Sequence, residues 1–137
     1  MYGEPGHAYV YFTYGMHWML NVVTNPAGFP AAVLIRSIKP VIGLEVIRTL
    51  RPCPQIHGSQ PNEKGWTDGP AKLCQALAID GSINELDLCT SDSDLWLAES
   101  GTLVPENEMT KSPRIGLNNV PEPWKSIPWR YQWKVTK

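Results

Sequence analysis

The chain has 137 residues, 42% hydrophobic and 18% charged, which is enough for one compact domain with a core and too little for two. A formal net charge of −1 excludes the strongly basic balance of a typical nucleic-acid-binding protein, so any such binding must come from a local patch. No apolar run is long enough to span a bilayer and no export signal opens the chain, so we expect an intracellular protein.

The first elements along the chain are two strand-like runs that flank a glycine. Residues 8–12 and 18–24 are rich in aromatic and β-branched side chains, which favour a pleated sheet. Gly15 lies between them and can adopt the positive φ of a tight turn, so we expect a β-hairpin. A period of two places Tyr9, Tyr11 and Thr13 on one face and Ala8, Val10 and Phe12 on the other.

Turns, short strands and helices are expected to alternate through the rest of the chain. Residues 25–28 form a turn, residues 31–38 a third strand that ends before Pro40, and residues 42–50 a helix. The composition of residues 52–67, rich in Pro, Gly, Ser, Gln and Asn, predicts an exposed loop.

A second helix is expected near Pro70, because Asp68 is a capping residue and proline is tolerated at the first helical position. Three later strands are expected at residues 95–98, 114–117 and 129–135. The pattern predicts a single α+β domain over residues 1–137, with a mainly antiparallel sheet, a protruding hairpin and a few helices.

Sequence templates for common cofactor and metal sites are absent. There is no phosphate-binding glycine loop, no dinucleotide fingerprint and no paired cysteine motif. The histidines His7, His17 and His57 are isolated in sequence from the cysteines Cys53, Cys74 and Cys89. We expect the three cysteines to be reduced thiols. We therefore expect neither a cofactor nor a metal.

The hairpin is the most informative segment for function. It brings several tyrosines, the tip Tyr14–His17 and the amide of Asn21 into a short span. An aromatic side chain at a hairpin tip could wedge into a duplex, and aromatic faces could stack on an extruded base. The alternative is that these tyrosines are ordinary strand residues, and periodicity alone favours that alternative.

Four blocks of the sequence, in the same order, resemble the signatures of the alkyladenine (3-methyladenine) DNA glycosylase family: residues 9–21, 69–79, 112–117 and 128–131. The resemblance covers essentially the whole chain and is far more specific than a single short motif. It implies base-excision repair without a cofactor, in the cytoplasm, nucleoid or nucleus. The partner would be duplex DNA with alkylated or deaminated purines, which the enzyme flips out and hydrolyses at the N-glycosidic bond.

The resemblance also implies roles for individual residues of the hairpin. Tyr14 would fill the gap left by the flipped nucleotide, with Met16 and His17 against the neighbouring bases. Tyr11 would form one wall of an aromatic sandwich around the base. Asn21 would line the pocket where a guanine amino group would clash.

Three residues outside the hairpin receive roles in the same way. Arg36 and the backbone carbonyl of Ile115 would hold the attacking water, and Lys72 would contact a phosphate. The alternatives are a sheet-surface charge for Arg36, simple core packing for Ile115 and a solvated first-turn lysine for Lys72.

One family segment has no counterpart in this sequence. The family carries a Glu-x-Tyr motif and a histidine ahead of the hairpin, whereas residues 1–6 resemble the lead-in directly before it. We therefore expect a chain that is N-terminally truncated relative to the family and impaired, because general-base catalysis is commonly worth ~10²- to 10⁴-fold. Glu4 is the nearest substitute base, but its position favours an exposed loop charge, and Tyr2 is a poor replacement for the missing wall.

The missing segment also predicts an unpaired sheet edge and exposed apolar surface, which a second copy or another chain could cover. Two other functions stay open. One is a non-catalytic module that binds lesions without cutting them. The other is a stacking platform for single strands, which a preference for single strands over duplex would identify.

Overall fold

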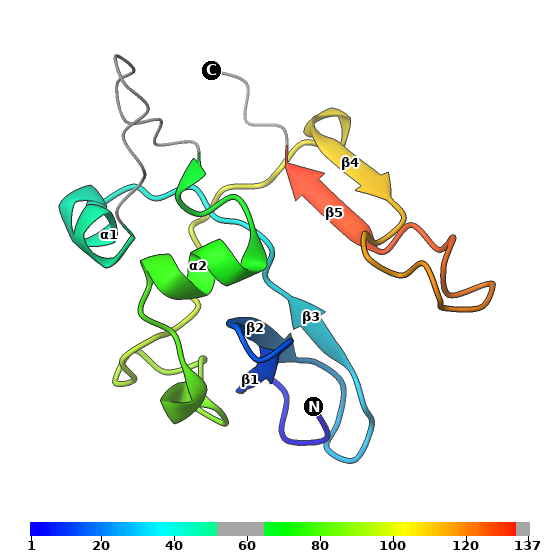
Figure 1. Cartoon of the computed structure of the whole chain (residues 1–137), viewed down its shortest axis with the longest axis horizontal. Helices are drawn as coiled ribbons and strands as arrows, with labels where there is room; N and C mark the ends of the chain where they lie inside the picture. Colours follow the sequence, from blue (N-terminus) through cyan, green and yellow to red (C-terminus); the bar gives the residue numbers. More distant parts are fainter. Residues whose placement is uncertain (52–64, 134–137) are drawn as a thin grey trace. The chain divides into compact units, whose positions relative to one another are not determined.

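The computed structural model describes residues 1–51 and 65–133 and divides into two compact units, residues 1–98 and 99–137 (Figure 1). The first unit contains a three-stranded antiparallel sheet and two helices, and the second contains a two-stranded antiparallel sheet. The expected α+β class with mainly antiparallel strands is confirmed.

The first sheet is built on the expected hairpin. Strands β1 (Ala8–Thr13) and β2 (His17–Val23) pair in antiparallel register, and β3 (Ala32–Leu34) pairs with the other edge of β2. The third strand is shorter than the expected range 31–38, although the Ile35 amide still donates to the Leu20 carbonyl at 3.0 Å.

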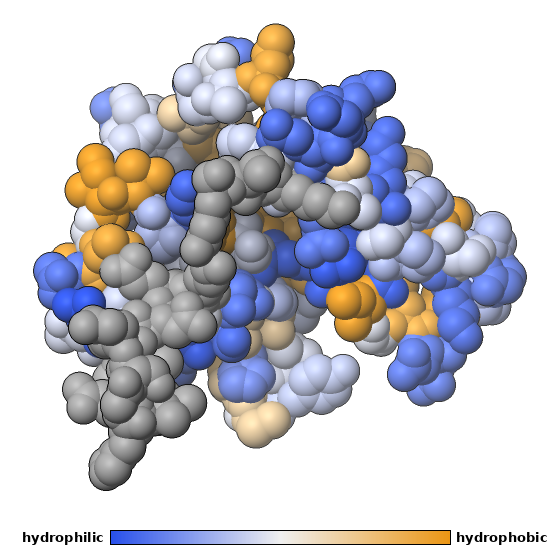
Figure 2. Space-filling view, turned by 90° about the horizontal axis from the view of Figure 1, so that it is seen from above, coloured by the Kyte–Doolittle hydropathy of each residue, from blue (hydrophilic) through white to orange (hydrophobic). Residues whose placement is uncertain are grey.

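The outer edge of β1 is covered at its start by a later segment of the chain, so the expectation of an unpaired edge does not hold at Gly6 and Ala8. The Ala8 amide donates to the carbonyl of Leu86 at 2.8 Å, and the Leu88 amide donates to the carbonyl of Gly6 at 3.0 Å. A later loop segment of the chain therefore satisfies backbone groups that an open edge would expose. The expected exposure of apolar side chains does occur, and Figure 2 shows hydrophobic surface at several places on one face.

Helix α2 (Pro70–Ala76) packs against β2 and closes the core of the first unit (Figure 1). Pro70 begins this helix as expected, but the capping residue is Gly69, with no side-chain cap. Asp68 accepts a hydrogen bond from Lys72 instead. The core cluster is apolar and comes from β1, β2, α2 and the following loops: Ala8, Val10, Leu20, Leu73, Cys74, Ile79 and Leu88.

Helix α1 (Leu44–Leu50) begins two residues later than expected, after Gly43, whose φ is 78°. Its buried residue Ile47 packs with Trp66 and Ala76 in a second, smaller cluster. Among the described residues, two short 3-10 helices follow, η2 (Gly81–Ile83) and η3 (Glu106–Glu108).

The second unit differs most from the expected elements. Its strands are β4 (Met109–Ser112) and β5 (Arg130–Trp133). The strand expected at 95–98, at the end of the first unit, and the strand expected at 114–117 are not formed. Pro113 and Gly116, the latter at φ 87°, explain the second error, because neither residue suits a regular ladder. Most of the expected loop 52–67 lies outside the described residues, as do Cys53, His57 and the end of the last expected strand.

Candidate nucleic-acid interface

The hairpin tip is a tight turn with a strained aromatic residue. The Met16 amide donates to the Thr13 carbonyl at 3.0 Å, and Tyr14 and Gly15 have φ values of 52° and 66°. Two central residues with positive φ are typical of a type I′ turn. Glycine adopts this conformation freely, but in a bulky residue it is an outlier of the kind that clusters at functional sites.

The turn presents its side chains to solvent. The Tyr14 side chain is 88% exposed and Met16 is 66% exposed, while His17 is also exposed. Burying this much aromatic surface would be favourable, so the tip is suited to contact a partner that covers it. The tip therefore has the exposure that an inserting finger requires.

The two faces of β1 separate core from surface over residues 8–11 as the period of two predicts, whereas Phe12, expected on the core face, is 50% exposed. Ala8 and Val10 are buried, whereas Tyr9 is half-buried and Tyr11 is 36% exposed. The Tyr9 and Tyr11 rings lie 5.4 Å apart between centroids, at an interplanar angle of 36°. The outward face of β1 therefore offers two adjoining aromatic rings.

Asn21 lies beside these rings, because it is paired with Tyr9 across the hairpin. Its side chain is only 6% exposed, and its Nδ2 donates to the Tyr9 carbonyl at 3.1 Å. A buried amide must be hydrogen-bonded to offset its desolvation. This bond fixes the amide next to the aromatic face.

Arg36 and Tyr14 lie within electrostatic reach of Tyr11. Burial is the largest cause that raises the pKa of Tyr11, and the neighbouring phenols of Tyr9 and Tyr14 raise it further, while the Arg36 guanidinium lowers it. Arg36 is half-buried and follows β3 along the sheet. The structure thus brings Tyr11, Arg36 and the Tyr14 finger near one another.

Lys72 lies in the first turn of α2, and Ile115 follows β4 along the chain. The Lys72 Nζ is 2.6 Å from Asp68 Oδ1 in an exposed ion pair, which fits a solvated first-turn lysine. Ile115 belongs to the second unit and is 62% exposed, so the alternative of core packing is wrong. Its expected role beside Arg36 stays a prediction.

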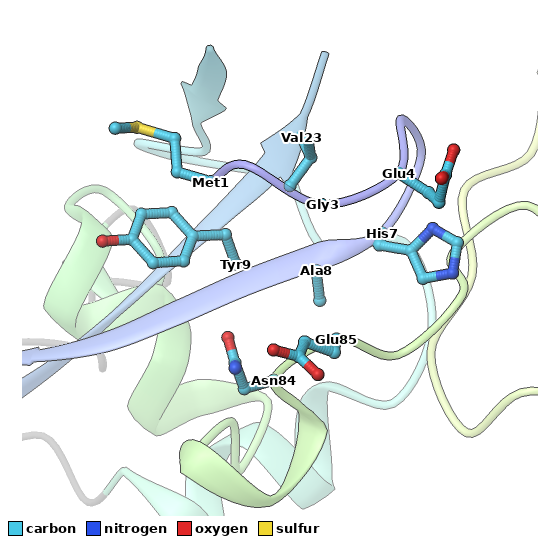
Figure 3. Close-up of a pocket in the computed structure, with 9 residues that line it drawn as sticks. All are labelled: Met1, Gly3, Glu4, His7, Ala8, Tyr9, Val23, Asn84 and Glu85. Atoms are coloured by element: carbon cyan, nitrogen blue, oxygen red, sulfur yellow. The ribbon is translucent and has the colours of Figure 1, made fainter. Parts of the chain in front are cut away.

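A hollow of about 420 Å³ lies along β1 beside Tyr9 (Figure 3). Its lining comes from the leading segment, the first two strands and a later turn: Met1, Gly3, Glu4, His7, Ala8, Tyr9, Val23, Asn84 and Glu85. Figure 3 shows the Glu4 carboxylate on the His7 side of the hollow, pointing away from the Tyr9 ring. This placement fits the loop-charge interpretation of Glu4.

Comparison with known proteins decides the family. The family model described as methylpurine-DNA glycosylase matches residues 1–137, the whole chain. The chain belongs to the methylpurine-DNA glycosylase family.

The chain is similar to curated relatives from several organisms. A candidate 3-methyladenine DNA glycosylase from Carboxydothermus hydrogenoformans is 44% identical over 137 residues, covering 100% of this chain and 65% of the relative. Candidate 3-methyladenine DNA glycosylases from Burkholderia lata and Methanocella arvoryzae are 38% and 41% identical over 131 residues, covering 96% of this chain and 58% and 60% of the relatives. The chain thus spans about three fifths of the length of the curated relatives it matches.

The turn at Asn84 and Glu85, which line the hollow, was not predicted from the sequence. The Leu86 amide donates to the Ile83 carbonyl at 3.1 Å, and Glu85 has a φ of 70° after an extended Asn84. This is the pattern of a type II turn, which usually has glycine at the Glu85 position. Asn84 Oδ1 also accepts a hydrogen bond from the Val10 amide at 2.8 Å. No glycine marks the turn, so the sequence carried no signal for it.

Residues 1–51 and 65–133 contain no group of three or more His, Cys, Asp and Glu placed to hold a metal ion. Within those ranges no helix has the length and apolar character needed to cross a membrane. Cys74 and Cys89 are free thiols, and burial raises the pKa of the Cys74 thiol.

Proposed function

We propose that this protein acts in base-excision repair, by turning a damaged purine out of duplex DNA and hydrolysing its N-glycosidic bond to give an abasic site. The observation that carries the proposal is Tyr14, an aromatic residue in a strained left-handed conformation at the exposed tip of a hairpin. Family membership supports the choice of DNA as the partner.

Tyr14 would act as the finger that occupies the gap in the base stack. Removing a base from a duplex costs stacking and pairing energy, and an inserted side chain recovers part of that loss. Met16 and His17 follow Tyr14 on the same exposed tip and would contact the bases next to the gap.

Tyr11 would stack on the extruded purine, with the Tyr9 ring beside it. The Asn21 amide, held by the Tyr9 carbonyl, would face the purine edge and disfavour a guanine amino group, so that adenine-type lesions are preferred. This preference follows because the guanine amino group and the Asn21 amide nitrogen are both hydrogen-bond donors, and placing one against the other leaves a donor without an acceptor. Damaged alkylated or deaminated purines are the substrates that we expect.

Arg36 would hold the attacking water, together with the backbone carbonyl of Ile115. Arg36 is half-buried, follows β3 and lowers the pKa of Tyr11, which supports a position near the aromatic face. Hydrolysis also needs a carboxylate that accepts a proton from this water as it attacks the sugar carbon. We assign no carboxylate of the described residues to that role, so we expect release by this chain to be slow. Glu4 is not proposed for this role, because its carboxylate points away from the aromatic face (Figure 3).

DNA contact in this account is local, because the formal net charge of the chain is −1. Lys72 forms an exposed ion pair, and such pairs contribute little to stability, so its Nζ could exchange Asp68 for a DNA phosphate. We place the protein where cellular DNA is found, in the cytoplasm and nucleoid or in the nucleus.

The proposal is tested by single-turnover release of the base from a duplex oligonucleotide that contains hypoxanthine or 3-methyladenine. We expect lesion-selective binding with release that is slow for lack of an assigned carboxylate base. Both should be lost in Tyr14→Ala and retained in Tyr2→Ala, a matched control at a tyrosine that is 63% exposed but outside the hairpin. If the unmodified protein shows neither release of the base nor lesion-selective binding, the proposal is contradicted. Binding that prefers the lesion without release would support a lesion-binding module instead.

A further inference from the structure

Trp18 joins the hairpin to the rest of the first unit, one residue pair below the tip. It is paired with Phe12 across the hairpin, and the two rings lie 4.7 Å apart between centroids. Trp18 is half-buried and also packs against the main core cluster. Only the Thr13–His17 pair separates this aromatic pair from the turn that carries Tyr14.

Gly81 provides the surface on which the Trp18 ring lies. A Cβ added at Gly81 would lie 2.9 Å from Cη2 and 3.2 Å from Cζ3 of the Trp18 indole. Real Cβ atoms essentially never approach another heavy atom to 2.9 Å, so a side chain there would displace the ring or the turn. The absence of a side chain at Gly81 is therefore what allows Trp18 its observed position.

The turn that contains Gly81 is held in place on both sides. Asp80 Oδ1 accepts a hydrogen bond from the Ser82 amide at 2.8 Å. Hydrogen bonding to the Ser82 side chain, and to a smaller extent to the Ser82 amide, lowers the pKa of Asp80. Asn84 Oδ1 accepts from the Val10 amide and so ties the end of the turn to β1. Because these hydrogen bonds hold the turn, a side chain at Gly81 would displace the Trp18 ring rather than the turn. That displacement would shift the end of the hairpin.

We propose that Gly81 is a positioning residue for the DNA-probing finger: its contact with Trp18 sets the direction and rigidity of the hairpin end that carries Tyr14. The inference rests on the proposed function, because it concerns how well Tyr14 enters the base stack. A displacement of about 1 Å in a group that positions the substrate can lower the rate on the order of 100-fold.

The test compares the unmodified protein with Gly81→Ala, Trp18→Phe and the double variant that combines them. Gly65→Ala is the matched control, because a Cβ at Gly65 would meet no described residue within 4 Å and Gly65 has no positive φ. There are three readouts. The fluorescence of 2-aminopurine next to the lesion reports unstacking, and the other two are the affinity for undamaged duplex and the single-turnover rate of release.

We expect Gly81→Ala to reduce lesion-dependent unstacking and release by roughly 10- to 100-fold, with affinity for undamaged duplex unchanged. The double variant should recover most of this loss, because the smaller phenylalanine ring leaves room for the added methyl group. A merely structural role would lower all readouts together and show no such recovery. If Gly81→Ala does not fold, Trp18→Phe alone should still show the loss, since it loosens the same contact without a clash.

Unstacking and release unchanged in both Gly81→Ala and Trp18→Phe would overturn this inference while the proposed function stands. Parallel loss of all three readouts without recovery in the double variant would overturn it too. If the unmodified protein neither unstacks nor releases the lesion, the proposed function fails and the inference fails with it.

Discussion

Tyr11 shows how single residues set the chemistry of the aromatic face. Its hydroxyl lies among other phenols and a guanidinium, and burial outweighs the opposing charge of Arg36, so its pKa is raised above 10.0. The side chain therefore stays a neutral phenol under physiological conditions. A neutral ring can stack on a purine without the cost of burying a phenolate.

The raised pKa of Tyr11 gives a prediction about pH. Because its folded pKa lies above the unfolded value, its contribution to stability is complete below about pH 10 and is lost as the pH rises through the folded pKa. Titration of the ultraviolet phenolate absorbance, compared between the unmodified protein and Tyr11→Phe, should show one phenol that ionises above 10. A Tyr11 midpoint at or below 10 would refute the assigned environment.

At the scale of elements, the β1–β2 hairpin is joined by one turn and packed against another, and left-handed backbone conformations occur in both. Glycine adopts such a conformation without strain, whereas residues with a side chain do not. Gly15 occupies a left-handed position that suits it, whereas Tyr14 and Glu85 occupy left-handed positions that disfavour a side chain. The Glu85 turn pairs with the edge of β1 through the Glu85 amide, which donates to the Ala8 carbonyl at 2.8 Å. The strain is therefore stored in a turn that the sheet holds in place.

Replacing Glu85 with glycine should relieve this strain. A left-handed conformation costs a non-glycine residue about 1–2 kcal/mol, so we expect Glu85→Gly to increase the free energy of unfolding by about 1 kcal/mol. Glu85→Ala keeps the Cβ and should not give this gain. Urea denaturation monitored by circular dichroism measures both, and a less stable glycine variant would show that the conformation is not strained.

The elements that could be predicted from the sequence are those with strong local signals. The alternation of residues 8–13 and the glycine at position 15 predicted the hairpin, and Pro70 predicted the start of α2. Residues 95–98 and 114–117 also carry strand-like side chains, but they form no strand in the described structure. Pairing depends on partners distant in sequence, which local propensity does not contain.

At the scale of the whole molecule, the first unit is held by a core between the sheet and α2. Leu73 is the centre of contact, with 0% of its surface exposed, and it packs with residues of both hairpin strands. The candidate site lies on the other face of the same sheet. Its geometry therefore depends on this core, although none of the core residues reaches the site.

Truncating Leu73 should destabilise the first unit without changing its surface. Large-to-small changes at such positions cost about 2–5 kcal/mol, so Leu73→Ala should lower the free energy of unfolding by that amount. Ile42→Ala, at a position that is 90% exposed, is the control and should change it by less than about 0.5 kcal/mol. Equal effects of the two substitutions in urea denaturation would contradict the described core.

The candidate site was only partly predictable for the same reason. The sequence predicted that Tyr11 and Asn21 would share the hairpin, and the resemblance added Arg36, which the sheet brings within electrostatic reach of Tyr11. The contact between Trp18 and Gly81 and the turn at Glu85 were not predicted. Both arise where residues more than 60 positions apart in the chain meet, and a single sequence carries no local pattern for such meetings.

The central claim is that Tyr14 senses a damaged purine by entering the base stack, and the affinity ratio between lesion-bearing and undamaged duplex tests it most directly. We expect the unmodified protein to prefer the lesion duplex, and Tyr14→Ala to bind both duplexes equally while its stability is not reduced. A preference that persists in Tyr14→Ala, or equal affinity of the unmodified protein for both duplexes, would contradict the claim.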